Sequence, residues 1–256
     1  MSTKIIAIAN HKGGVGKTTT VASVGAALAS RGYRVLLVDL DAQSNLSSSL
    51  SLDFALNVTP ERTIYEALRE GKELPIVEVS KNLSLVPSSL DLAGIELDLS
   101  SSMEREYLLK DLLEEVKSSY DCMLLDTPPS LGLLTVNAFV AATDVVIPLT
   151  AEALPSKGLQ KITDIIARTQ RRLNTALSLS GIVITRYEKS KLSQMVEDAL
   201  RAGYGDLVFN TKIRKNISVA EAPLYSKSIL EYAPESNGAK DYADLATEIE
   251  QKIVIR

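Results

Sequence analysis

The stretch Lys12-Gly13-Gly14-Val15-Gly16-Lys17-Thr18-Thr19 decides the fold of this 256-residue chain. It follows a short apolar run at residues 5–9 and precedes a helical pattern that extends to about Arg31. A glycine-rich turn between a strand and a helix directs its backbone N–H groups and the helix N-terminus toward an anion. Glycines also let the backbone approach phosphate groups closely. The stretch therefore predicts a phosphate-binding loop.

Two side chains of this loop have predictable roles. Lys17 is expected to reach the β- and γ-phosphates of a nucleotide, and the Thr18 hydroxyl is expected to ligate Mg²⁺. The standard motif has a glycine where His11 stands, so the strict pattern fails, and a second lysine, Lys12, opens the loop. His11 is the only histidine, and we expect it to be a loop residue beside the phosphates. The predicted nucleotide-binding residues are Gly13, Gly14, Val15, Gly16, Lys17, Thr18 and Thr19.

Three aspartates stand at the ends of apolar runs. Asp39 and Asp41 come directly after residues 35–38, and Asp126 closes the run at residues 122–125. The carboxyl ends of parallel strands form the ligand crevice of open α/β sheets. An acidic residue that closes an apolar strand holds Mg²⁺, directly or through water, in enzymes that cleave nucleotides. Aspartates also cap helices and start turns, but three of them at strand ends beside a phosphate loop predict a metal and water site.

Short apolar runs alternate with amphipathic segments along the whole chain. The runs are apolar on both faces, as in strands that helices cover on both sides. Parallel strands need crossovers, which helices supply. We therefore predict an α/β fold with a doubly wound, mostly parallel sheet flanked by helices, in a single domain over residues 1–256. The predicted strands are residues 5–9, 35–38, 83–86, 122–125, 145–149 and 182–184, and the predicted helical faces lie within 108–116, 159–166, 192–200 and 242–253.

Composition indicates a globular protein of the cytoplasm. Hydrophobic residues make up 45% and charged residues 23%, so disorder is not the expected state. The single cysteine, Cys122, excludes an intrachain disulfide and a cysteine-rich metal cluster within one chain. The sequence has no apolar run long enough to cross a bilayer and no signal-peptide pattern.

Taken together, these motifs resemble the ParA/MinD superfamily of ATPases with a deviant Walker A motif. They are most similar to small ParA-type (Soj-like) partitioning ATPases. The resemblance implies a P-loop NTPase fold, ATP and Mg²⁺ as cofactors, hydrolysis of ATP to ADP and phosphate, and a homodimer that forms on ATP binding. It rests on ANHKGGVGKTTT (9–20), VLLVDLDAQSN (35–45), DTPPSLGLLTVNA (126–138), VVIPLTAEALPSKGLQ (145–160), VFNTKIRKN (208–216) and VAEAP (219–223).

The resemblance also implies roles for individual residues. Lys12 resembles the signature lysine, which in the family reaches across an ATP-sandwich dimer to the phosphates of the other subunit. Asp41 resembles the residue that orients the attacking water, so the expected catalytic residues are Lys12, Lys17 and Asp41. The remaining expectations are Thr18, Asp39 and Asp126 around Mg²⁺, and Thr185, Arg186 and Ile213 near the adenine.

Three positions depart from the family pattern. The family usually has Gln or Gly at His11 and Pro at Arg214, and a basic residue where Ser218 stands. The last two departures affect the expected adenine packing and the expected DNA contact.

The distribution of charge predicts where DNA would bind. The net charge is -4, which by itself argues mildly against a nucleic-acid partner. Residues 153–227, however, contain 13 basic and 6 acidic residues, a net charge of +7. Residues 1–152 carry -8 and residues 228–256 carry -3. A basic segment in an acidic chain is the footprint expected for non-specific DNA binding, and we expect the contacts at Lys189, Lys191, Arg214 and Lys215.

The functional hypothesis is an ATPase that segregates plasmid, chromosome or mobile-element DNA with a ParB-type centromere-binding protein, on the nucleoid. The alternative of a MinD-like membrane-cycling ATPase needs a basic amphipathic C-terminal anchor. Residues 248–256 have only two basic residues, so we expect no stable membrane association. An electron donor like the nitrogenase iron protein needs two cluster cysteines and is excluded by the single Cys122. A synthetase such as dethiobiotin synthetase, and a DNA-binding module without activity, remain to be tested by ATPase assay.

Overall fold

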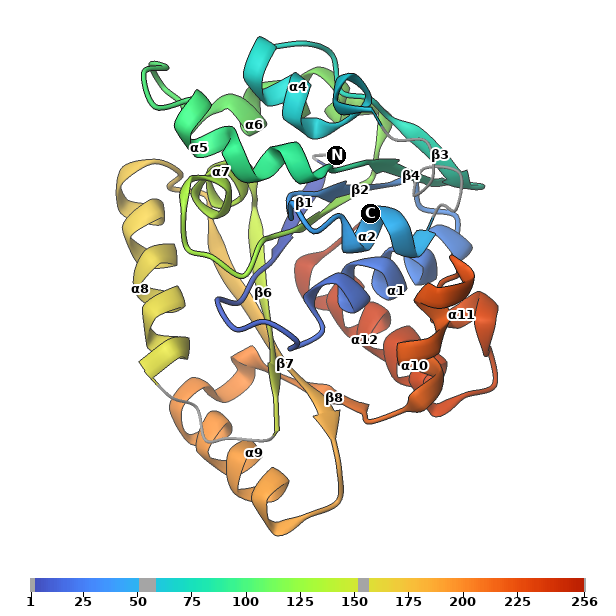
Figure 1. Ribbon diagram of the computed structural model, residues 1–256. Helices are drawn as coiled ribbons and strands as arrows, with labels where there is room; N and C mark the ends of the chain where they lie inside the picture. Colours follow the sequence, from blue (N-terminus) through green and yellow to red (C-terminus); the bar gives the residue numbers. More distant parts are fainter. Residues whose placement is uncertain (1–2, 51–58, 152–156, 256) are drawn as a thin grey trace.

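The apolar runs of the sequence pair side by side in one eight-stranded sheet (Figure 1). The computed structural model describes residues 3–50, 59–151 and 157–255. The strand order is β3-β4-β2-β5-β1-β6-β7-β8. The strands are β1 (Lys4–Ile8), β2 (Val35–Asp39), β3 (Val77–Ser80), β4 (Leu83–Val86), β5 (Cys122–Asp126), β6 (Asp144–Thr150), β7 (Ser178–Tyr187) and β8 (Val208–Arg214).

The sheet is parallel except at one edge, where β3 runs antiparallel to β4. This confirms the predicted doubly wound, mostly parallel α/β fold. The sequence analysis missed β3 and β8, which are the two edge strands. Edge strands are half exposed and therefore lack a continuous apolar run: Glu78 interrupts β3, and Asn210 is exposed in β8. β7 is also longer than the predicted residues 182–184, because its first residues are more polar than its buried centre.

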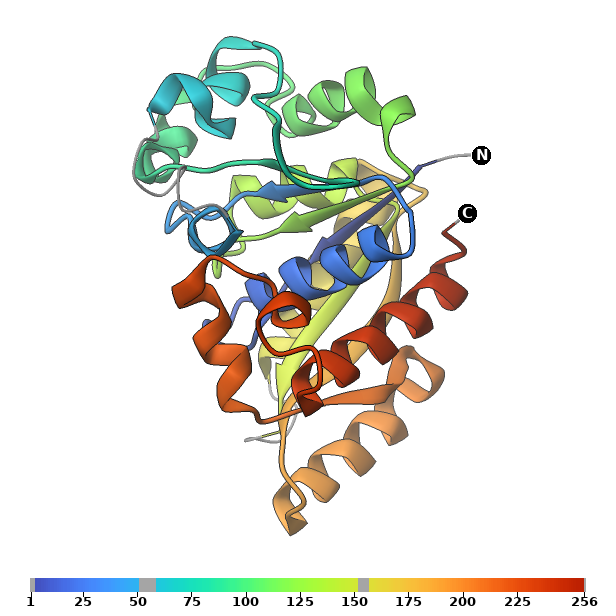
Figure 2. The ribbon, with the colours of Figure 1, turned by 90° about the vertical axis from the view of Figure 1, so that its right-hand side faces the viewer.

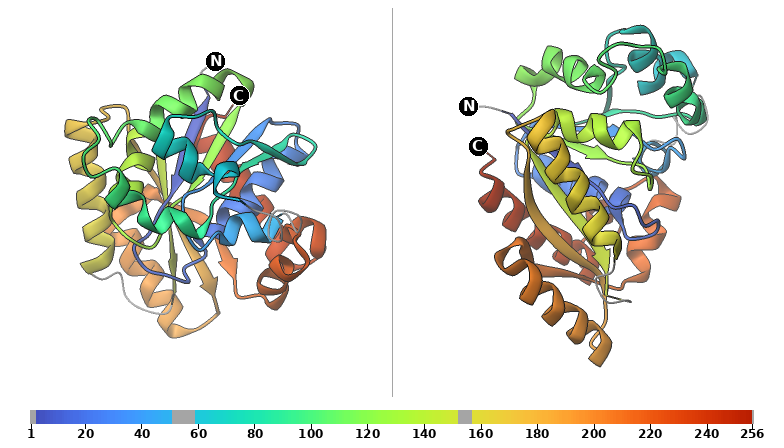
Figure 3. Two further views of the ribbon diagram at one scale, coloured as in Figure 1. Left: turned by 45° about the horizontal axis from the view of Figure 1, so that its top comes forward. Right: turned by 90° about the vertical axis from the view of Figure 1, so that its left-hand side faces the viewer.

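Helices cover both faces of the sheet. Figure 2 looks onto the layer of α1, α2 and α10–α12, and the right-hand view of Figure 3 looks onto the side of α7 and α8. The first layer contains α1 (Lys17–Ser30), α2 (Asn45–Leu50), α10 (Ile217–Glu221), α11 (Ile229–Tyr232) and α12 (Asn237–Ile253). The second contains α4 (Ile64–Glu70), α5 (Ile95–Asp98), α6 (Leu108–Val116), α7 (Leu133–Ala141), α8 (Lys157–Arg172) and α9 (Lys191–Tyr204).

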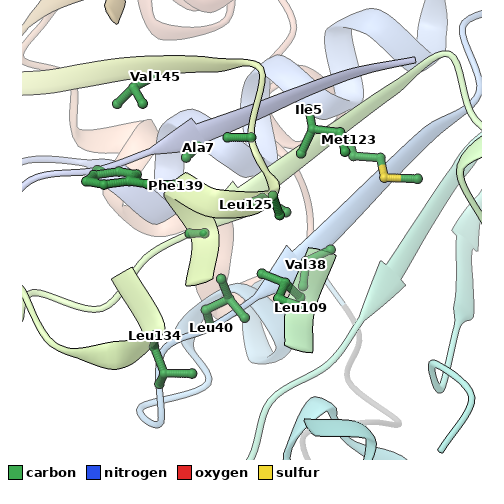
Figure 4. Packing of buried hydrophobic residues seen from close by; sticks show 14 of the residues in the cluster. Ile5, Ala7, Val38, Leu40, Leu109, Met123, Leu125, Leu134, Phe139 and Val145 are labelled. Atoms are coloured by element: carbon green, nitrogen blue, oxygen red, sulfur yellow. The ribbon is translucent and has the colours of Figure 1, made fainter. Parts of the chain in front are cut away.

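Each central strand supplies both layers with core residues. Successive side chains of a strand point to opposite faces. In β1, Ile5 and Ala7 pack under the second layer, and Ile6 and Ile8 pack under the first. Figure 4 shows the side of Ile5, where Phe139 from α7 joins the strand residues. This two-sided burial is why the central strands read as continuous apolar runs.

The last helix packs on the sheet, as the sequence analysis expected. The residues Tyr242, Leu245, Ala246, Ile249 and Ile253 of α12 are all buried. Over the described residues, none of the helices combines the length and the apolar character that a membrane crossing requires. Residues 152–156, part of the stretch 145–160 that resembles the ParA/MinD superfamily, lie outside the described residues.

Candidate nucleotide-binding site

A pocket of about 820 Å³ lies where the phosphate-binding stretch meets the carboxyl ends of the strands. Residues 13–19 line it, except for the buried Val15. Asp41 and the carboxyl ends of β7 and β8, with Thr185, Arg186 and Ile213, also contribute to the lining. One cavity therefore contains residues predicted from three separate motifs. Its size is that of a small-molecule site.

The loop adopts the conformation that its glycines permit. Gly14 and Gly16 have φ angles of 72° and 87°, in the left-handed region that favours glycine. Gly16 is the residue before α1, and its carbonyl accepts hydrogen bonds from the backbone N–H and the hydroxyl of Thr20, at 2.9 and 2.7 Å. The first N–H groups of α1 have no carbonyl partner within the helix. The glycines thus leave a helix N-terminus open toward the pocket, where an anion is favoured.

Lys17 is buried at the base of this pocket. Only 7% of the Lys17 surface is exposed, and burial lowers the pKa of the Lys17 ammonium group. The negative charges of Asp126 and Asp41 partly oppose this shift of the pKa. Over the described residues, no carboxylate lies within 4.0 Å of the Lys17 ammonium nitrogen. A buried cation without an ion pair is a suitable partner for phosphate oxygens.

Asp39 is the last residue of β2, and its carboxylate accepts hydrogen bonds from residues that follow it in the chain. Its Oδ2 accepts hydrogen bonds from the backbone N–H and the hydroxyl of Ser47, at 2.9 and 2.7 Å. Its Oδ1 accepts the backbone N–H of Asp41 at 3.1 Å. Burial raises the pKa of Asp39 to about 6, and these hydrogen bonds oppose the shift. Asp39 therefore also anchors the segment that leads from β2 into α2.

Asp126 ends β5 and has no such donors. The residue is fully buried, and neither carboxylate oxygen has a hydrogen-bond partner among the described residues. Burial raises the pKa of its carboxyl group well above the ordinary value, and the charge of Asp39 adds to this. The Thr18 hydroxyl and the Lys17 ammonium group lie near enough to lower this pKa, but the hydroxyl does not reach hydrogen-bond geometry. A buried carboxylate of this kind requires a cation or a proton.

The residues of this corner fit a magnesium ion. Mg²⁺ is usually held by one or two carboxylates together with nucleotide phosphates and water, not by a cage of protein ligands. Accordingly, the described residues contain no group of three His, Cys, Asp or Glu side chains placed to bind a metal. The unpartnered carboxylate of Asp126 and the nearby hydroxyl of Thr18 are the groups that such an ion would use.

Lys12 stands apart from the pocket. It is exposed and is not among the residues that line the cavity. Its backbone N–H donates to the side-chain oxygen of Asn10 at 3.0 Å, and the Asn10 amide donates to the carbonyl of Pro148 in β6 at 2.7 Å. Asn10 was not predicted from the sequence. The available signal was a polar residue directly after the apolar run at residues 5–9.

The predicted adenine residues include one whose hydroxyl is already engaged. The Thr185 hydroxyl contacts the carbonyl oxygens of Val15 and Leu149, at 2.9 and 3.1 Å. Thr185 therefore fastens the phosphate-binding loop to the sheet. Arg186 is exposed with a φ of 52°, whereas Ile213 is 3% exposed, and both line the pocket. Tyr242 of α12 also lines the pocket and was missed, because its spacing in the sequence indicates only a core position.

The four residues predicted to contact DNA lie at the carboxyl ends of β7 and β8. The backbone N–H of Lys215 donates to the carbonyl of Tyr187 at 3.1 Å, which places the two strand ends side by side. Lys189 and Lys191 are exposed, and neither forms an ion pair within the described part of the chain. The other two are paired: Arg214 with Asp241 at 2.5 Å and Lys215 with Glu188 at 2.8 Å.

Comparison with known proteins agrees with this fold. A family model described as an AAA domain matches residues 3–179. The chain is 41% identical over 250 residues to the sporulation initiation inhibitor protein Soj of Bacillus subtilis, covering 96% of this chain and 98% of that protein. It is 42% identical over 250 residues to the chromosome-partitioning ATPase Soj of Treponema pallidum, with 96% of each covered.

Solved structures extend the comparison. A plasmid partition protein of Borrelia burgdorferi bound to AMPPNP superposes with a TM-score of 0.85 at 27% identity, covering 98% of this chain and 99% of that one. A protein described as a cobyrinic acid a,c-diamide synthase of Mycobacterium smegmatis, with bound ADP and magnesium, gives a TM-score of 0.81 at 35% identity, with 98% and 96% covered. The fold and the loop define a P-loop nucleotide-binding protein. Within that class, the chain belongs to the ParA/Soj family of partitioning ATPases.

Proposed function

We propose that this chain, as a single domain over residues 1–256, is a partitioning ATPase. It binds ATP with Mg²⁺, dimerises, binds DNA without sequence preference and hydrolyses ATP when a ParB-type protein stimulates it. The observation that carries the proposal is the pair of unpartnered carboxylate oxygens on Asp126, buried beside Lys17 and Thr18 at a glycine-rich loop. The family of the chain and the AMPPNP bound to the Borrelia burgdorferi protein support the same assignment.

In this proposal the protein acts by positioning the reactants and stabilising charge. Phosphoryl transfer to water passes through a loose transition state whose charge spreads over the phosphoryl oxygens. The N–H groups of the loop and the Lys17 ammonium group bind those oxygens. Magnesium, when bound beside Thr18 and Asp126, supplies further positive charge. Asp41, which lines the pocket, orients the attacking water.

Dimerisation completes the site in this proposal. Lys12 is exposed and does not line the pocket of its own subunit. In this proposal the lysine contributes its charge to the phosphates of a second copy. One subunit alone then lacks part of the positive charge that the transition state requires, and hydrolysis stays slow until ATP-bound subunits pair. This behaviour suits a timing switch.

DNA binding is proposed at the carboxyl ends of β7 and β8. Non-specific binding depends on lysines and arginines that neutralise phosphates. Lys189 and Lys191 are the exposed and unpaired cations of the predicted set, and Arg214 and Lys215 would extend it. A nucleotide-dependent protein with this surface would reside in the cytoplasm on the nucleoid.

The buried face of α12 disfavours the membrane-cycling alternative. The apolar residues of this last helix contact the sheet, so they are not available to enter a bilayer surface. The similarity to a protein described as a synthase supports a second candidate, ATP-dependent amide formation on a small molecule. That activity requires an acceptor, whereas the partitioning switch does not.

Phosphate release from ATP tests the proposal. The wild-type chain is expected to hydrolyse ATP with Mg²⁺ and without any added metabolite, and faster with non-specific duplex DNA. Lys17→Ala is the control, because it removes the buried cation of the pocket. A wild-type chain that neither binds nor hydrolyses Mg²⁺-ATP would refute the proposal. Turnover that requires a small-molecule acceptor would instead favour the synthase.

A further inference from the structure

The imidazole of His11 is seated directly against the backbone of Gly158. Gly158 is the second residue of α8, and it packs against the residue that precedes Lys12. A Cβ atom placed on Gly158 would overlap Cε1 of His11 and come within 2.6 Å of its Nε2. Real Cβ contacts essentially never fall below 3.0 Å. Glycine at position 158 is thus what allows the ring to occupy this place.

The environment of the ring nitrogen Nδ1 bears on why the ring lies there. The Nδ1 atom of His11 is buried and has no hydrogen-bond partner among the described residues. A buried polar atom without a partner is unfavourable, so hydrogen bonding of Nδ1 does not explain the position of the ring. The close fit of the ring against the backbone of Gly158 in α8 explains that position instead.

The residues on either side of His11 connect this contact to Lys12. Asn10 is fixed to Pro148 of β6 and accepts the backbone N–H of Lys12. The backbone that enters the loop is therefore held at two places, by Asn10 on the sheet and by the His11 ring on α8. Displacing the His11 ring would therefore shift the backbone between Asn10 and Lys12.

We propose that His11 is a positioning residue for Lys12 and that Gly158 provides the space its ring requires. The inference rests on the proposed function, in which Lys12 acts on the nucleotide of a second subunit. His11 does not line the pocket. It sets where Lys12 projects, and it makes the placement of Lys12 depend on the position of the first turn of α8.

A double-mutant comparison tests this coupling by the kinetics of Mg²⁺-ATP hydrolysis. Gly158→Ala is expected to lower kcat about tenfold or more, because a small misplacement of a catalytic group is costly, and to leave KM within about threefold. In a His11→Gly background, which itself lowers kcat, the same substitution is expected to cost less than about twofold, because the ring is gone. An equal loss in both backgrounds would overturn the proposal.

Gly203→Ala in α9 is the matched control, since a Cβ at this helical glycine would meet no atom within 4 Å. Alanine is the better helix former at either position, so a loss confined to Gly158→Ala cannot come from helix propensity. Gly203→Ala is expected to retain the wild-type kcat and KM.

The placement of Lys12 can also be read without activity. His11 is the only histidine, so a tag-free sample gives one set of imidazole signals in a long-range ¹H–¹⁵N spectrum. Gly158→Ala is expected to shift these signals and the backbone amide signal of Lys12, and Gly203→Ala to leave both in place. If the His11 and Lys12 signals are unchanged in Gly158→Ala, the inference is overturned, whether or not the protein hydrolyses ATP. Shifted signals in a wild type without ATP turnover would support the contact and refute only the proposed function.

Discussion

Asp39 and Asp126 are paired in register at the carboxyl ends of β2 and β5, and of the two only Asp39 receives hydrogen bonds from the described residues. The two carboxyl groups lie on neighbouring strands, both fully buried. Burial and mutual repulsion disfavour ionisation of both together. A divalent cation bound at Asp126 would relieve that conflict. The proposed magnesium site would thus tie the stability of the protein to the ligand it binds.

This relationship predicts that Asp126→Asn stabilises the protein when magnesium is absent. The substitution removes a buried carboxyl group that must either stay charged or take up a proton, and that has no hydrogen-bond partner among the described residues, so the free energy of unfolding should rise by about 1 kcal/mol or more. For a chain of this size, that raises the unfolding midpoint by about 2–4 °C. Thermal unfolding in EDTA measures the effect. The variant should also lose the additional stability that Mg²⁺-ATP gives the wild type.

Asp144→Asn is the control for this comparison. Asp144 is also buried, but its Oδ2 accepts the Thr143 hydroxyl at 2.7 Å and its Oδ1 accepts the Ser180 hydroxyl. Asparagine would break part of this network, so this substitution should lower the unfolding midpoint. A lower midpoint in Asp126→Asn would mean that its carboxylate is satisfied in solution.

A second prediction concerns acid stability and Glu197 of α9. Burial raises the pKa of this carboxyl group, but hydrogen bonds from Lys212 and Arg201 outweigh it and lower the pKa overall. The folded state therefore binds the proton more weakly than the unfolded chain. The resulting stability is present above the unfolded pKa of about 4.3 and is lost as the pH falls through the folded value.

Glu197→Gln should accordingly destabilise the protein near neutral pH, and the difference from wild type should shrink as the pH falls below the unfolded pKa of about 4.3. The expected loss is about 1 kcal/mol, because Lys212 and Arg201 remain partly solvated and water screens the pair. Urea unfolding across this pH range measures it. Glu188→Gln, at an exposed ion pair with Lys215, should have little effect. A pH-independent difference between wild type and Glu197→Gln would contradict the assignment.

Residue roles that depend on neighbours in the sequence could be predicted, and contacts between distant parts of the chain could not. Gly14, Gly16 and Asp126 were identified because their roles follow from adjacent residues: glycines between a strand and a helix, and an acid at the end of an apolar run. The hydrogen bonds of Asn10 and Thr185 were not predicted because their partners lie far along the chain, 138 residues away for Pro148 and 170 for Val15. The spacing of residues in the sequence gives no information about such contacts.

The edge strand β8 illustrates the same limit. Its polar residues hide it as a strand, yet its carboxyl end closes the pocket through Ile213. Arg214 was chosen for DNA binding from its charge alone. In the structure, its guanidinium group binds the carboxylate of Asp241 through both Nε and Nη2, at 2.5–3.1 Å. A local count of charge cannot distinguish a cation that is free for DNA from one held by a helix that follows it.

The roles proposed for Lys12 and Asp41 predict opposite effects of their substitution on the dimer. Lys12→Ala should abolish ATP-dependent dimerisation, because the second subunit then lacks a cation for the phosphates. Asp41→Ala should leave an ATP-bound dimer that persists, because the attacking water is not oriented. Size-exclusion chromatography with Mg²⁺-ATP distinguishes the two, and Lys81→Ala, at an exposed lysine of the β3–β4 turn, should behave as wild type. An unaltered elution profile for Lys12→Ala would exclude action on a second subunit.

Lys189 and Lys191, which form no ion pair with the described residues, predict how DNA binding depends on charge and salt. Each phosphate contact that is lost reduces the slope of log affinity against log salt by about 0.9, because fewer counterions are released. Lys189→Glu with Lys191→Glu should therefore abolish ATP-dependent binding at physiological salt, and at low salt the residual binding should show a shallower slope. Fluorescence anisotropy with duplexes of two unrelated sequences measures both. Reversing Lys81 in the β3–β4 turn and Lys110 in α6 instead makes the same change in net charge away from the carboxyl ends of β7 and β8, and it should preserve binding. If both double variants bind equally well, the DNA surface lies elsewhere, and if both fail, net charge and not this surface governs the interaction.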